Sequence, residues 1–90
     1  MVVRLGRVSL VPAGEQAPAG QTVAAEDGRL VLVGDGATDD RCSVAAADAE
    51  LIETAACGVY LRVARATRLE AGAQAAMIEP GLYQVIRRQG

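Results

Sequence analysis

The best candidate for a functional site is one acidic segment, residues 34–40 (GDGATDD). Asp35, Asp39 and Asp40 supply hard carboxylate oxygens, the ligands that Ca²⁺ and Mg²⁺ prefer. The segment has neither the spaced acids nor the terminal Glu of an EF-hand loop. Asp and Gly are also the residues that tight turns favour. We therefore interpret the segment as a turn first and as a cation site second.

Nucleophilic and phosphate-binding chemistry finds little support in the residue types. The chain contains no histidine, which removes the usual general base near neutral pH and the commonest transition-metal ligand. Ser9 and Ser43 therefore have no histidine to activate them. The Gly-Asp-Gly of residues 34–36 is followed by no P-loop lysine. We expect no catalytic residue and no cofactor.

Five arginines near the C-terminus form the second group of interest, namely Arg62, Arg65, Arg68, Arg87 and Arg88. They fall in two segments that alternate like strands. If those strands pair, several guanidinium groups share one face and can bind an acidic partner protein. The alternative is a set of solvated strand positions that suppress edge-to-edge aggregation.

The composition bounds the function classes further. A net charge of −2 argues against an electrostatic nucleic-acid binder, which needs a basic face. No run approaches the 18 apolar residues of a membrane span, and the N-terminus has no leader-like segment. We expect a cytoplasmic protein without nucleic-acid or membrane partners, in which Cys42 and Cys57 are buried free thiols.

The elements that must position these residues are short strands between glycine turns. Asp27-Gly28 is the strongest signal, because this dipeptide accepts the positive φ of a two-residue hairpin turn. Glu79-Pro80-Gly81-Leu82 is typical of a type II turn. The expected extended segments are residues 7–11, 22–25, 29–33, 42–44, a strand from 51, 59–69, 76–78 and 82–88.

These segments predict one all-β domain over residues 1–90, a small barrel or two-layer sandwich. We expect six to seven short, mostly antiparallel strands. The core has little aromatic area, because Tyr60 and Tyr83 are the only rings. Many small strands, or burial against a partner, suit such a supply of Ala, Val and Leu.

The order of the motifs resembles a family of small, uncharacterised bacterial and phage-associated β proteins. That family opens with a strand ending in Leu-Val-Pro, continues through a Gly-Glu-x-Thr-Gly-His-x-His loop and closes with a Pro-Gly-x-Tyr-x-Val-x-Arg-Gln strand. The matching pieces here are residues 8–12 (VSLVP), 29–33 (RLVLV), 36–38 (GAT), 48–52 (DAELI), 59–63 (VYLRV) and 80–89 (PGLYQVIRRQ). The resemblance covers nearly the whole chain and implies the fold more than a role.

The resemblance also implies a metal site that has changed in this chain. The family carries two histidines in the loop and two more before the last hairpin, and the corresponding residues here are Asp40, Cys42, Glu70 and Ala73. Asp40, Cys42 and Glu70 remain possible ligands, although a mixed set of this kind is weaker and differently selective. Loss of the site leaves a scaffold or binding protein.

Two functions follow as expectations. The first is a non-enzymatic protein-binding or assembly module, either a homo-oligomer or a small accessory subunit of a bacterial or phage system. The second is a metal-dependent binder or enzyme that uses Asp40, Cys42 and Glu70. A ubiquitin-like modifier is a distant third, because the helix that a β-grasp fold requires is missing.

Overall fold

The computed structural model describes residues 2–5, 8–14, 16, 19–33, 42–55, 58–71 and 73–87. Within these ranges the chain forms ten strands and no helix, and hence no helix able to cross a membrane. The strands are β1 (Val3–Leu5), β2 (Val8–Pro12), β3 (Gln21–Thr22), β4 (Arg29–Val33), β5 (Cys42–Ala45), β6 (Ala49–Glu53), β7 (Val59–Val63), β8 (Thr67–Ala71), β9 (Gln74–Ile78) and β10 (Gly81–Arg87).

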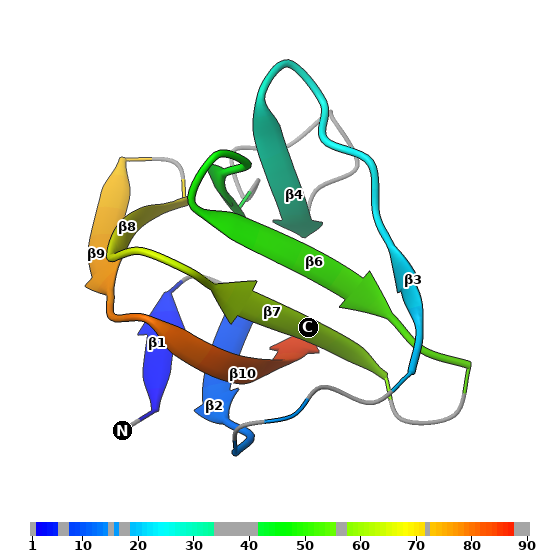
Figure 1. Ribbon diagram of the computed structural model, residues 1–90. Helices are drawn as coiled ribbons and strands as arrows, with labels where there is room; N and C mark the ends of the chain where they lie inside the picture. The colour runs from blue at the N-terminus through cyan, green and yellow to red at the C-terminus, as the bar shows by residue number, and fades with distance from the viewer. Residues whose placement is uncertain are drawn as a thin grey trace.

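The strands form two antiparallel sheets that pack as a two-layer sandwich (Figure 1). The six-stranded sheet has the order β1-β2-β10-β7-β6-β3, and the four-stranded sheet has the order β4-β5-β8-β9. The predicted all-β class and the sandwich are confirmed. The barrel alternative is wrong, because no ladder joins the two sheets within the described part of the chain.

The strand number is higher than expected partly because β1 lies outside the expected segments and partly because the predicted strand over residues 59–69 is two strands. Its alternation continues through both halves, but β7 belongs to the six-stranded sheet and β8 to the four-stranded one. The backbone N–H groups of Ala64 and Arg65 both donate to the carbonyl of Asp48, at 2.8 and 3.3 Å. These bonds turn the chain and carry it from one layer to the other.

One aliphatic core lies between the layers. Alternation along β2, β6, β7 and β8 points every second side chain inward, as a half-buried strand requires. The confirmed positions include Val8 and Leu10 on the first predicted strand, which are 1% and 0% exposed. The other fully buried large side chains are Leu32, Cys42, Val44, Leu51, Leu61, Leu69 and Ile78.

The predicted hairpin around Asp27-Gly28 is correct in its turn and wrong in its strands. Asp27 and Gly28 both have positive φ, 52° and 77°, and Glu26 bridges Arg29 across them. A type I′ turn needs this geometry. The strand before the turn, however, pairs with β6 in the other sheet, so the two arms of the predicted hairpin belong to different layers.

The second predicted turn, Glu79-Pro80-Gly81-Leu82, is not part of a hairpin either. Its φ of 152° at Gly81 lies far from the value near +80° that a type II turn requires. The segment instead carries the chain from β9 in one sheet to β10 in the other. The Tyr83 hydroxyl donates to the Glu79 carbonyl at 2.7 Å and holds this crossing.

Candidate functional site

A groove runs beside the edge of β6, at the point where β3 stops. β3 pairs only with the last two residues of β6. The last backbone hydrogen bond between the two segments joins the Val23 N–H to the Leu51 carbonyl at 2.8 Å. The chain then leaves β6 to reach the Asp27-Gly28 turn. The space between them is a pocket of about 430 Å³, a size that suits a short ligand segment.

The backbone of Ala49 faces this groove. Along an antiparallel strand, successive residues direct their N–H and C=O groups to opposite sides. The Leu51 carbonyl bonds toward β3, whereas the Asp48 carbonyl accepts the Ala64 N–H on the β7 side. Ala49, two residues before Leu51, therefore directs its N–H and C=O toward the groove. The described part of β3 does not extend far enough to pair with them.

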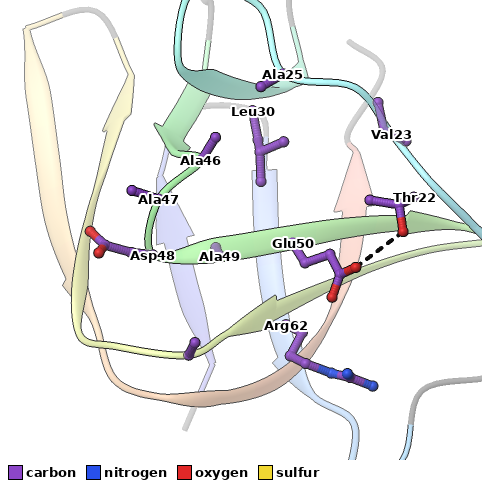
Figure 2. A pocket seen from close by; sticks show the side chains of 11 residues that line it. Thr22, Val23, Ala25, Leu30, Ala46, Ala47, Asp48, Ala49, Glu50 and Arg62 are labelled. Carbon is purple, nitrogen blue, oxygen red and sulfur yellow. Dashed lines mark hydrogen bonds between the residues drawn. The ribbon is translucent and has the colours of Figure 1, made fainter.

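Small side chains line the walls and leave that backbone accessible. Figure 2 shows Ala25 and Leu30 on one side of the space and Ala49 on the other, with Ala46 at one end and Val23 at the opposite end. Leu30 is 3% exposed and joins the groove to the core. The lining is thus apolar and shallow around one strand edge.

Polar groups stand at the rim, and most of them have partners. The Thr22 hydroxyl donates to Glu50 Oε1 at 3.1 Å (Figure 2). Arg65 Nη2 lies 3.1 Å from Asp48 Oδ1 and also donates to the Ala47 carbonyl at 3.1 Å. These contacts hold β3 and the turn before β6 in place. Arg62 also lines the groove, and its exposed side chain takes part in none of these contacts, so the rim carries one positive charge (Figure 2).

The structure does not bring together Cys42 and Glu70, two of the three predicted metal ligands. Cys42 pairs with Ala71 and points into the core, where burial raises the pKa of its thiol to about 11. Its neighbour Ser43 pairs with Glu70 on the outer face of the same sheet. Cys42 and Glu70 therefore point to opposite faces, and Asp40 lies outside the described residues.

Glu70 has a different partner, which the sequence did not single out. Arg29 crosses β5 on the outer face and places Nη2 3.0 Å from Glu70 Oε2. Its Nε donates to Ser43 Oγ at 2.9 Å and its Nη2 to the Ser43 carbonyl at 3.1 Å. No group of three or more Cys, Asp or Glu side chains suited to one metal ion occurs among the described residues.

The predicted arginine face is only partly assembled. The expected pairing of the two segments occurs, since β7 pairs with β10, and Arg62 is exposed on the outer face of this sheet. Arg65 is instead bound to the turn before β6, and Arg68 lies in the other sheet. Arg87 is in β10 and pairs with Val8. The side chain of Arg87, all of Arg88 and Cys57 lie outside what the structure describes.

The groove had no signal in the residue types, because its distinguishing group is the main chain of an alanine. The alanines of residues 45–50 were compatible with a helical turn and gave no hint of a strand edge. Comparison with protein-family models, curated proteins and solved structures found no match to this chain. The family resemblance therefore stays a prediction, and the site rests on its own geometry.

Proposed function

We propose that this chain is a non-enzymatic protein-binding module that holds an extended segment of a partner protein in the groove beside β6. The single observation that carries the proposal is the Ala49 backbone, whose N–H and C=O face an apolar groove beyond the end of β3. Adding a strand to an exposed sheet edge is a recurrent mode of peptide recognition.

The main chain of the partner supplies the affinity in this mode. An extended partner residue opposite Ala49 can exchange two hydrogen bonds with it. The partner strand then pairs with the edge of β6 just beyond the part that β3 covers. Backbone groups that are removed from water must find a partner, so a bound strand satisfies Ala49 as well as itself. The hydrogen bond from the Val23 N–H to the Leu51 carbonyl lies on the same edge of β6, so extended backbone already pairs with this edge two residues away.

Side chains of the partner set the specificity. Successive residues of a strand point to opposite faces, so every second side chain enters the space between Leu30 and the alanines of the wall. We expect small or medium apolar side chains at these positions, because the rim carboxylates of Asp48 and Glu50 are already bonded. The alternate positions face solvent and are free to vary.

A displayed library of random 12-residue peptides tests the proposal. Selection against the intact chain should enrich sequences with alternating apolar residues. Ala25→Trp fills the groove and should abolish binding of the selected peptides, whereas Ala75→Trp adds the same ring to an exposed position on β9 and should leave binding intact. Equal binding by both variants would contradict the proposal.

A second readout tests the strand geometry itself. Methylating the peptide nitrogens one at a time should weaken binding at every second residue, because only alternate N–H groups face β6. Hydrogen exchange should show the Ala49 amide protected in the complex. A uniform effect of methylation, or an Ala49 amide that exchanges at the free rate, would mean that the peptide binds without adding a strand.

The assembly in which such a module works stays a prediction. We expect such a module to be a homo-oligomer or an accessory subunit of a bacterial or phage assembly. The metal-dependent alternative at Asp40, Cys42 and Glu70 is tested by metal analysis of protein purified without chelators. A stoichiometric metal on the purified chain would make that alternative the working hypothesis.

A further inference from the structure

A second surface lies away from the groove, on the outer face of β1, β2 and β10 (Figure 1). The register places Arg4 directly opposite Ser9 and Ser9 directly opposite Ile86, so the three side chains form one row across three strands. Val2 and Val11 lie beside this row, and the five residues line a shallow depression of about 380 Å³. We refer to these five residues as the outer patch.

The outer patch is apolar where solvent-facing strand positions are usually polar. Val2 and Ile86 are 47% and 43% exposed, and they are two of the three large hydrophobic side chains exposed in the described part of the chain. On the opposite face of the same strands, Val8 and Leu10 are fully buried. The alternation therefore supplies apolar residues to both faces, and among the described residues only the inner face is covered by a second layer.

Arg4 stands in this apolar surface without a counter-charge. The ion pairs formed by described residues involve Arg29 and Arg65, and no side-chain hydrogen bond among them includes Arg4. A guanidinium flanked by apolar side chains is matched by a carboxylate with apolar neighbours, since both the charge and the buried surface then find partners.

We propose that the outer patch binds a partner protein through a segment that presents an Asp or Glu between apolar side chains. A second copy of this chain fits less well, because a two-fold contact centred on the patch sets one Arg4 against the other. The chain as a whole carries a net charge of −2, so the attraction is local to the patch. With the groove beside β6, the module has two separate binding surfaces.

The same random 12-residue library, selected against the Ala25→Trp chain, isolates the outer patch from the groove. Selected peptides should carry Asp or Glu beside apolar residues. Arg4→Glu should weaken them at least tenfold and select Lys- or Arg-containing peptides instead. Arg68→Glu makes the same charge change on an exposed position of β8 and is the matched control, with affinity expected to stay within about twofold.

Ile86→Ser tests the apolar half of the surface and should also weaken the peptides at least tenfold. Urea unfolding of each variant confirms that the fold is kept, since Arg4 and Ile86 are both exposed. Equal losses in Arg4→Glu and Arg68→Glu would overturn the proposal, because net charge alone would then explain the binding. Failure to enrich acidic peptides, or dimerisation through the patch in light scattering, would also overturn it.

Discussion

Gly20 controls how closely the chain before β3 approaches β6, and its replacement by alanine tests the geometry of the groove. A Cβ at this position would lie 2.6 Å from the Glu53 carbonyl oxygen and 2.9 Å from the Cγ2 atoms of Ile52 and Thr54. The contact with the Glu53 carbonyl is a backbone contact, so turning a side chain cannot relieve it. In Gly20→Ala, β3 must therefore move away from β6.

The size of the effect follows from these contacts. Overpacking of this kind typically costs about 1–3 kcal/mol. Because β3 has only two residues and lies at the edge of its sheet, the chain should yield there and leave the core intact. Since 1.4 kcal/mol corresponds to a factor of ten, protection of the Val23 amide against hydrogen exchange should fall by about 5- to 150-fold.

Native-state hydrogen exchange measures this loss of protection directly, because the Val23 N–H donates to the Leu51 carbonyl on the edge of β6 that β3 covers. The amide of Leu61, on the central strand β7, should keep its protection. Gly14→Ala is the control, since no atom lies within 4 Å of its added Cβ and its strain at φ of 89° is confined to another loop. Equal losses at Val23 and Leu61, or no loss at Val23, would refute the reasoning.

Two further predictions concern the four-stranded sheet. In a Cys57→Ser background, the free energy of unfolding should fall by about 1 kcal/mol per pH unit as pH rises from 9.0 toward about 11, because the Cys42 thiol ionises in the unfolded chain before it does so in the fold. Urea titrations at several pH values should show this slope, and Cys42→Ala should reduce it to the part that Tyr83 contributes, since burial raises the pKa of that phenol as well. Arg29→Lys should cost about 1 kcal/mol at any salt concentration, since a lysine cannot replace both hydrogen bonds to Ser43. Glu70→Gln should cost less than about 0.5 kcal/mol, because that ion pair is partly exposed; a larger loss in Glu70→Gln than in Arg29→Lys, measured by urea unfolding at low and high salt, would reverse this assignment.

The class of the fold and most of its strands could be predicted from the amino-acid sequence. The spacing of two residues between Val8 and Leu10, and between Val59, Leu61 and Val63, predicted the core-facing sides of two strands, and the structure confirms both. The Asp27-Gly28 turn was equally readable. These features depend on residues adjacent in the chain, so local periodicity and turn chemistry are sufficient to predict them.

The pairing of the strands could not be predicted in the same way, because it depends on contacts between segments far apart in the chain. The segment over residues 59–69 alternates in both halves and is interrupted only at Arg65, yet its halves lie in different sheets, because the bonds to the Asp48 carbonyl come from a distant turn. The strand before Asp27 likewise pairs with β6, a segment about thirty residues further along the chain. Alternation indicates that a segment is a half-buried strand, but it does not indicate which strand pairs with that segment.

The candidate sites divide in the same way. Glu70 and Cys42 were chosen by residue type, but the register sends one outward to Arg29 and the other into the core. The groove depends on where β3 ends relative to Ala49, which is a distance between segments far apart in the chain. Because its binding group is a backbone amide, residue identity could not reveal it, and only the packed sheet exposes it.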